Sequence, residues 1–337
     1  MCLYPRIIAN PKYKPNKKNG GKIPPVTDPR VTGVPIGCGN CIECRKQKAR
    51  NWQIRLLEEI KYTQNAYFIT LTFNDQSIAQ ISENYKTIKG YTLDNQIATT
   101  ATRYFLERWR KTHKKSLRHW LITELGHNGT NNIHMHGIIW LEKKEDIHKL
   151  DQHWQYGYTY KGTEIKEQGK ITGYKNYVNP ETIAYIIKYI TKQEEKYKHY
   201  KPIILCSPGI GNQYTKRING DWEKNKYNDI ETKETYITTT GHKIALPTYY
   251  RNKIYTDEEK EALWLIQLNK EKRYVLGNEI DISNGQQTYL NALEQARIKN
   301  ASLGYGTSKI NYDQKHYEQQ IREQMTNTRI QKGKNKK

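Results

Sequence analysis

Long apolar runs are missing from this 337-residue chain, and only 36% of its residues are hydrophobic. No segment approaches the roughly 18–20 consecutive apolar residues that a membrane-spanning helix needs, which excludes an integral membrane protein. The first residues, Met-Cys-Leu-Tyr-Pro-Arg, lack the apolar stretch of a secretory signal. The cysteines number only five, and three of them fall within seven residues, a pattern unlike a disulfide framework. We expect a soluble, intracellular protein with no membrane partner.

Negative charge is also scarce, because 34 Asp and Glu residues face 56 Lys and Arg residues, a formal net charge of +22. Basic side chains release counterions from nucleic-acid phosphates, and the rings of the 27 tyrosines can stack on exposed bases. A gene rich in A and T would produce the same excess of Lys, Asn, Ile and Tyr. Composition therefore leaves both explanations open and names no reaction.

The two ends of the chain differ from its middle. Seven of the eleven prolines lie within residues 1–35, which predicts an extended basic arm, and residues 331–337 predict a basic tail. Between them the alternating periodicities predict an α+β fold, an antiparallel sheet with helices on one face, followed by an accessory helical region at 256–330. The expected helices are 42–61, 98–113, 143–154, 180–195, 256–272, 285–299 and 312–325, and the expected strands are 67–73, 120–124, 134–141 and part of 156–177.

Two histidines one residue apart, His134 and His136, form the sharpest local motif. On a strand, residues i and i+2 project from the same face, so the two imidazoles can bind one metal ion together. Glu124 lies in the preceding strand, and across a hairpin it would add an oxygen ligand. Two imidazoles and a carboxylate with open positions suit Mg²⁺ or Mn²⁺ beside a phosphate. The alternative is a pair of histidines on a half-exposed strand.

The predicted helix at 180–195 carries a second motif. Its isoleucines recur at i, i+3, i+4 and i+7 and form a complete apolar stripe. Polar residues repeat with the same spacing on the opposite face: Tyr185, Lys188, Tyr189 and Lys192. Each tyrosine precedes a lysine by three residues, and a nearby cation favours the phenolate, which is the nucleophilic form. The two phenols, one turn apart, could serve two successive phosphoryl transfers; the alternative is a solvated surface.

Taken together, these motifs resemble the HUH endonucleases, and more narrowly the replication initiators of microviruses, the gokushovirus-type single-stranded DNA bacteriophages. The motifs, in chain order, are Phe68-Ile-Thr-Leu-Thr-Phe73, His134-Met-His136 and Tyr185-x-x-x-Tyr189-x-x-Lys192. The run from Cys38 to Arg45 and the turn Pro208-Gly-Ile-Gly211 also suit that family. The resemblance covers roughly residues 36–255, which would form the HUH domain.

The resemblance implies a ferredoxin-like or RRM-like sheet and a divalent metal on His134 and His136, with Glu124 as third ligand. Tyr185 and Tyr189 would be the nucleophiles and Lys192 the active-site lysine. A tyrosine would nick single-stranded DNA at the viral replication origin, leaving a 5′-phosphotyrosine link and a free 3′-OH for rolling-circle synthesis. Host DNA polymerase and a host helicase would be partners in the cytoplasm of the bacterial host cell, since the sequence lacks an ATPase phosphate-binding loop.

Motif order excludes conjugative relaxases, in which the tyrosine precedes the histidine motif. It leaves a two-tyrosine HUH transposase as an alternative enzyme. A non-catalytic RRM-like nucleic-acid-binding protein is the alternative from another class.

A third motif is the run of Cys38, Cys41 and Cys44. Three thiolates at this spacing can bind a structural Zn²⁺ or belong to an iron–sulfur cluster. Cys2 or Cys206 would have to supply a fourth ligand. The alternative is three small residues in a turn that enters a helix.

Overall fold

The computed structural model describes residues 2–126, 131–192, 196–217, 234–238 and 241–335, and the chain divides into two compact units. Unit 1 comprises Met1–Asn51 and Tyr214–Ile310, and unit 2 comprises Trp52–Gln213 and Asn311–Lys337. The sequence placed the boundaries instead near residues 35 and 255. It missed these units because each combines segments far apart in the chain. Within the described ranges no helix is both long and apolar enough to cross a membrane.

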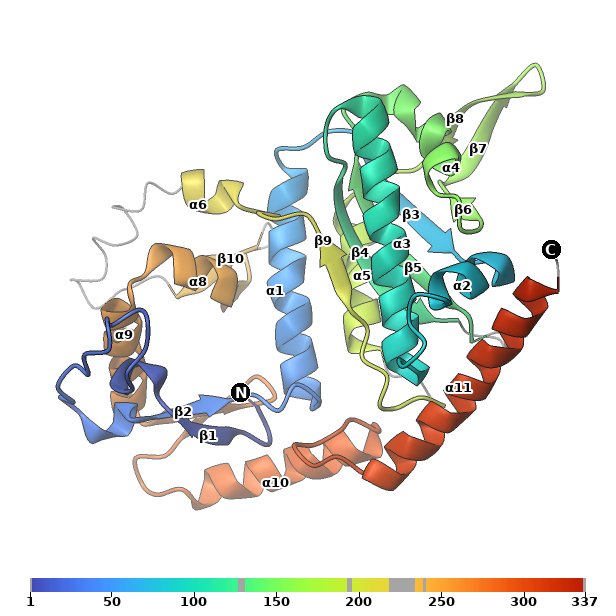
Figure 1. Cartoon of the computed structure of the whole chain (residues 1–337). Coiled ribbons are helices and arrows are strands. Elements are labelled where there is room, and N and C mark those ends of the chain that lie inside the picture. Colours follow the sequence, from blue (N-terminus) through green and yellow to red (C-terminus); the bar gives the residue numbers. More distant parts are fainter. Residues whose placement is uncertain (1, 127–130, 193–195, 218–233, 239–240, 336–337) are drawn as a thin grey trace. The chain divides into compact units, whose positions relative to one another are not determined.

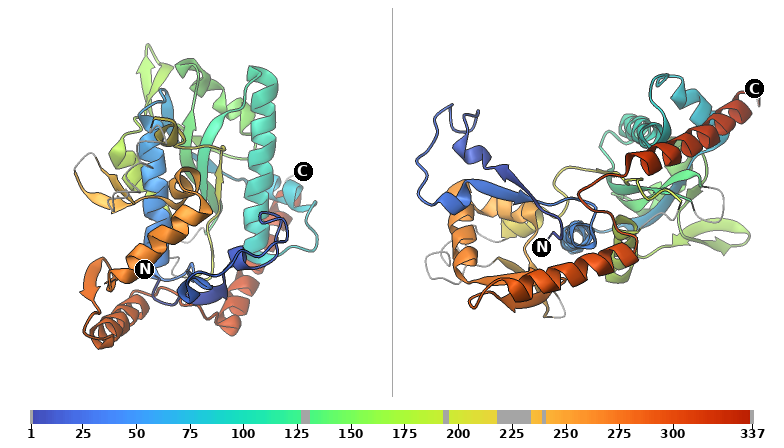
Figure 2. Two further views of the ribbon diagram at one scale, coloured as in Figure 1. Left: turned by 90° about the vertical axis from the view of Figure 1, so that its left-hand side faces the viewer. Right: turned by 90° about the horizontal axis from the view of Figure 1, so that it is seen from below.

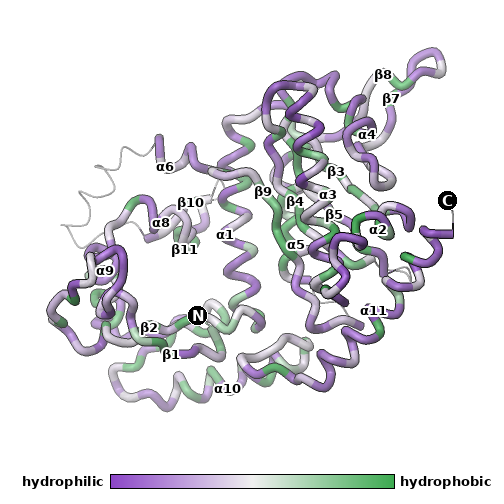
Figure 3. Tube along the Cα trace, viewed as in Figure 1, coloured by the Kyte–Doolittle hydropathy of each residue, from purple (hydrophilic) through white to green (hydrophobic). Residues whose placement is uncertain are grey.

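Unit 2 contains a five-stranded sheet in the order β6-β3-β5-β4-β9, with every neighbouring pair antiparallel (Figure 1). Its strands are β3 (Ala66–Thr72), β4 (Arg118–Leu125), β5 (Ile133–Trp140), β6 (Thr159–Tyr160) and β9 (Ile204–Cys206). The predicted α+β class and the predicted hairpin pairing of β4 with β5 are confirmed. Figure 3 shows hydrophobic residues along these strands and polar residues along much of α11 (Tyr312–Lys334).

One face of the sheet packs against α3 (Gly90–His113), with α2 (Asp75–Ser82) and α11 beside it. Met135 projects from β5 toward this face, where the Thr102 hydroxyl of α3 donates to its sulfur at 3.5 Å. Met135 is fully buried in a cluster that includes Phe105 of α3 and Leu121 of β4.

The opposite face is covered by α5 (Pro180–Thr191) and by the part of α1 (Ile42–Ile60) that belongs to unit 2. Trp52 of α1 meets Trp120 of β4 edge to face, with ring centroids 5.7 Å apart. Seen from below, α3 and α5 lie on opposite sides of the sheet (Figure 2, right). Helices therefore cover both faces, whereas the sequence predicted them on one. Seven consecutive residues of β4 are buried, as expected for a strand enclosed on both sides.

The start of α5 agrees with the sequence. Asn179 caps the helix by accepting a hydrogen bond from the Thr182 backbone amide, and Pro180 occupies the first position. The helix ends at Thr191, earlier than the predicted residue 195; residues 193–195 lie outside the described part of the chain.

The rest of unit 2 departs from the prediction between residues 143 and 177. The expected helix at 143–154 is a 3₁₀ segment, Lys144–Lys149, followed by the short α4 (Leu150–His153). The predicted strand region forms β6 and a separate hairpin of β7 (Thr163–Glu167) and β8 (Lys170–Lys175). Short α6 (Gln213–Arg217) follows β9.

In unit 1, residues 1–35 do not form an extended arm. Strand β1 (Arg6–Ala9) pairs with β2 (Gly33–Ile36), and Leu3 and Val31 are buried. The prolines misled the prediction because two of them start capped 3₁₀ turns, Pro11–Tyr13 and Pro29–Val31. The remaining elements are β10 (Thr235–Ile237), β11 (Lys243–Ala245), α8 (Thr248–Ile254), α9 (Asp257–Asn269), β12 (Lys272–Val275), β13 (Asn278–Asp281) and α10 (Gln287–Ser302).

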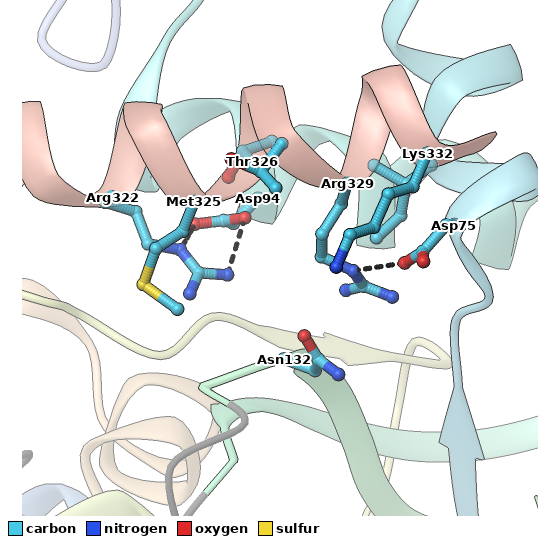
Figure 4. Close-up of a pocket in the computed structure, with 10 residues that line it drawn as sticks. Asp75, Asp94, Asn132, Arg322, Met325, Thr326, Arg329 and Lys332 are labelled. Atoms are coloured by element: carbon cyan, nitrogen blue, oxygen red, sulfur yellow. Dashed lines mark hydrogen bonds and ion pairs between the residues drawn. The ribbon is translucent and has the colours of Figure 1, made fainter. Parts of the chain in front are cut away.

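Helix α11 packs on the rest of unit 2 through a buried ion pair. The Arg322 guanidinium donates to the Asp94 carboxylate of α3 at 2.5 and 3.0 Å, and both side chains are at least 97% buried. They line a cavity of about 310 Å³ together with Asn132, Arg329 and Lys332 (Figure 4). This helix continues to Lys334, so the predicted basic tail is largely helical.

We expect Arg322→Ala to destabilise unit 2 by about 3–5 kcal/mol, because it leaves the Asp94 carboxylate buried without its guanidinium partner. Chemical denaturation followed by circular dichroism would measure the change in unfolding free energy. Lys332→Ala is the matched control, since Lys332 lines the same cavity but is exposed. Equal effects of the two substitutions would contradict this role of the ion pair.

Candidate active site

Three predicted ligands converge at the open ends of β4 and β5. Antiparallel register places Glu124 directly opposite His134, and His136 lies two residues further along the same face. The two histidine Nε2 atoms are 2.9 Å apart. Glu124 Oε2 is 3.2 Å from His134 Nε2 and 2.8 Å from His136 Nε2. These residues, which we call the triad, form a group that could hold a metal ion.

The triad has the dimensions of one face of an octahedron. With metal–ligand bonds of about 2.1 Å, neighbouring octahedral ligands are about 3.0 Å apart. The observed separations of 2.8–3.2 Å bracket that value. Two imidazoles and a carboxylate on one octahedral face leave three positions open. The donor set therefore fits a divalent ion that also binds a further ligand.

The outer nitrogens of both histidines are held in place. His134 Nδ1 donates to the backbone carbonyl of Asn132 at 3.0 Å, which leaves Nε2 as the unprotonated ligand atom. His136 Nδ1 is 2.9 Å from the hydroxyl of Thr70 on β3. Sequence reasoning assigned Thr70 no role. Its alternation with Phe68 on β3 was the available signal, because both lie on the face that carries the histidines.

We expect Thr70→Val to weaken divalent-metal binding by about 10- to 100-fold, the usual effect of removing an outer-sphere partner of a histidine ligand. Titration with Mn²⁺ followed by electron paramagnetic resonance would measure the affinity. Thr72→Val is the control, because the Thr72 hydroxyl bonds to the Tyr158 carbonyl and not to a histidine. Unchanged affinity in Thr70→Val would show that this hydroxyl does not orient His136.

Helix α5 brings both predicted tyrosines to the triad. The Tyr189 ring stacks on the His136 ring, with centroids 4.4 Å apart and planes 13° apart. The hydroxyls of Tyr185 and Tyr189 are 2.8 Å apart. The ring of Phe68 lies parallel to that of His136 and edge-on to that of Tyr185, each at 6.0 Å.

The four isoleucines of α5 are buried, as the periodicity predicted: Ile183, Ile186, Ile187 and Ile190. The tyrosines are not equally exposed. Tyr185 is 49% exposed, whereas Tyr189 is half-buried against His136. At 100° per residue Tyr189 lies only about 110° from the middle of the isoleucine stripe, so it contacts the sheet from the flank of the helix.

Burial sets the protonation of the site. Desolvation, with the positive charge of His134 as a second cause, lowers the pKa of His136 to about 3, so this imidazole is neutral and able to bind a metal. Desolvation also raises the pKa of the Tyr189 phenol, and the neighbouring Tyr185 raises it further. Without a cation close to its oxygen, Tyr189 therefore remains a neutral phenol at physiological pH.

Of the two predicted lysines, the structure brings only Lys192 to the triad. Lys192 caps the end of α5 with extended backbone, and its ammonium group forms an ion pair with Glu124 Oε1. The same nitrogen is 5.8 Å from the centre of the Tyr189 ring. Lys188 is exposed on α5, and no contact within the described ranges joins it to the triad.

The cysteine run lies in unit 1, apart from the triad in sequence. Cys2, Cys38, Cys41 and Cys44 form a second group that could hold a metal ion. The structure thus selects Cys2 as the fourth cysteine. Cys206 lies on β9 in unit 2.

Comparison with known families supplies the functional class. The family model of the replication-associated protein ORF2 matches residues 66–194, from the start of β3 to just beyond α5. Residues 66–194 belong to this family. The match covers somewhat more than a third of the chain and contains the triad and both tyrosines. No curated protein and no solved structure matches the chain.

This replication-associated protein family supports a role in initiating replication and suggests endonuclease activity in general. It is consistent with the rolling-circle initiators of small single-stranded DNA viruses. It also suggests binding to DNA at an origin.

Proposed function

We propose that the protein nicks and rejoins single-stranded DNA at a viral replication origin through a 5′-phosphotyrosine intermediate. The observation that supports this most directly is the stacking of Tyr189 on His136, with the Tyr185 hydroxyl in contact with that of Tyr189. Two potential nucleophiles and a potential metal site thereby share one surface. This combination suits transfer of a phosphoryl group between DNA and protein.

Glu124, His134 and His136 would hold Mg²⁺ or Mn²⁺. When bound, the ion would neutralise part of the charge on the scissile phosphate and orient its oxygens. The mixed nitrogen and oxygen donors suit Mn²⁺ better than Mg²⁺, which prefers oxygen ligands alone.

In the first step the phenolic oxygen of one tyrosine attacks the phosphorus atom. A bond from tyrosine oxygen to phosphorus forms, and the bond from phosphorus to the 3′-oxygen breaks. The tyrosine loses its proton and the leaving 3′-oxygen gains one, so no net proton is consumed. The product holds the 5′ end of the DNA on the protein and frees a 3′-OH.

The second tyrosine supports a second round. It would cleave the regenerated origin, after which the free 3′-OH would attack the first phosphotyrosine and release a circle. The hydroxyls are close enough, at 2.8 Å, for either phenol to reach a phosphate placed at this position.

Lys192 is proposed as the cation that assists this chemistry. Its ion pair with Glu124 orients a metal ligand, and its position beside the Tyr189 ring supplies positive charge where the phenolate would form. Lys188, exposed on the same helix, would contact the DNA backbone instead.

The free 3′-OH would be extended by host DNA polymerase, with a host helicase opening the duplex. We place this reaction in the cytoplasm of a bacterium infected by a microvirus. The proposed HUH domain is the sheet of unit 2 with α3 and α5.

The test is a covalent protein–DNA adduct. Purified full-length protein is incubated with a labelled single-stranded oligonucleotide carrying the origin and Mn²⁺, then separated on a denaturing gel. A labelled band at the mass of the protein plus the 5′ product, absent with EDTA, is expected. Retarded DNA on a native gel without any covalent band would instead indicate a non-catalytic binding protein.

A further inference from the structure

The four cysteines of unit 1 lie at the distances of a closed metal site. All four sulfur atoms are within 4.8 Å of one another. The closest pairs are Cys2 with Cys41 at 3.8 Å and Cys38 with Cys44 at 4.0 Å. A disulfide needs about 2.05 Å between sulfurs, and all four cysteines are free.

These separations match one tetrahedral ion. With zinc–sulfur bonds of about 2.3 Å, the sulfurs of a tetrahedral site are about 3.8 Å apart. An iron–sulfur cluster places inorganic sulfide and several irons between the cysteines and spreads their sulfurs farther. The site is therefore suited to a single ion.

The backbone around the cysteines stabilises thiolate charge. The amides of Tyr4 and Cys38 donate to the Cys2 sulfur at 3.3 and 3.2 Å, and the Cys41 amide donates to the Cys38 sulfur at 3.3 Å. Gly39 has a φ of +76°, which only glycine adopts readily, and it turns the chain so that Cys38 and Cys41 converge. Such hydrogen bonds to ligand atoms are the outer sphere expected of a metal site.

We propose that Cys2, Cys38, Cys41 and Cys44 bind one Zn²⁺ as a structural tetrathiolate. Four protein ligands complete a tetrahedron and leave no position for substrate, so the site serves folding. The site adjoins a small core made of six buried residues: Leu3, Cys41, Ile42, Val275, Leu293 and Ala296. Zinc would fasten the N-terminal segment and the start of α1 to this core.

This inference does not depend on the proposed nicking activity. The experiment is metal analysis of purified full-length protein by inductively coupled plasma mass spectrometry, after dialysis without chelator. One zinc per chain is expected in the wild type, in the His134→Ala/His136→Ala variant and in the Cys206→Ser control. Cys2→Ser is expected to reduce the zinc content at least about tenfold. Adduct formation, assayed on the same samples, reports on the nicking site separately.

A second measurement covers a Cys2→Ser variant that fails to fold. Wild-type protein refolded with Co²⁺ should show the intense thiolate-to-cobalt and tetrahedral ligand-field absorption of a tetrathiolate site. Thiol titration in denaturant with chelator should find five free thiols. Wild-type protein without zinc, iron in its place, fewer than five thiols or a cobalt spectrum without thiolate bands would each overturn the proposal.

Discussion

The double variant Tyr185→Phe/Tyr189→Phe is expected to lose the covalent DNA adduct, with a nicking rate at least about 10⁴-fold below wild type. Phenylalanine keeps the ring that stacks on His136 but lacks the oxygen that would attack phosphorus. Fold, metal affinity and DNA affinity should therefore stay near the wild-type values. Single-turnover cleavage of the labelled origin oligonucleotide, with Mn²⁺ titration as the second readout, would measure both effects.

Single variants and a control make this result specific. Tyr177→Phe removes a highly exposed phenol shortly before α5 and should cleave at the wild-type rate. Each single Tyr→Phe variant should still form an adduct with the remaining tyrosine, but should not release a closed circle from a two-origin substrate. Adduct persisting undiminished in the double variant would eliminate both tyrosines as nucleophiles.

Much of this site could be predicted because it depends on local periodicity. The i, i+2 spacing of His134 and His136 placed both on one strand face, and the short link to Glu124 predicted the hairpin. The position of Lys192 could not be predicted in the same way. It reaches Glu124 because α5 ends at Thr191, whereas helical periodicity would have kept it on the tyrosine face.

Contacts between distant segments explain the rest of what the sequence missed. Thr70 contacts His136 only because β3 pairs with β5. Arg322 reaches Asp94 across more than two hundred residues, and its guanidinium also donates to the Asn131 carbonyl. The next carbonyl, that of Asn132, orients His134, so α11 contributes to the environment of the triad. Composition and periodicity contain no term for such pairings.

The second large effect concerns the metal. His134→Ala/His136→Ala is expected to abolish Mn²⁺ binding at micromolar protein and to lower adduct formation about 10²- to 10⁴-fold, the loss of several kcal/mol of charge stabilisation at the phosphate. Mn²⁺ titration by electron paramagnetic resonance and the adduct gel would measure the two losses. His148→Ala is the control, because His148 is an exposed histidine outside the triad.

The two double variants should therefore fail in different ways. The phenylalanine variant should bind Mn²⁺ without forming an adduct, whereas the histidine variant should lose both properties while both phenols remain. If the histidine variant kept full adduct formation in EDTA, the triad would have no part in the chemistry. Lys192 would then be the cation nearest the Tyr189 ring, and charge stabilisation at the phosphate would have to come from lysine rather than from a metal.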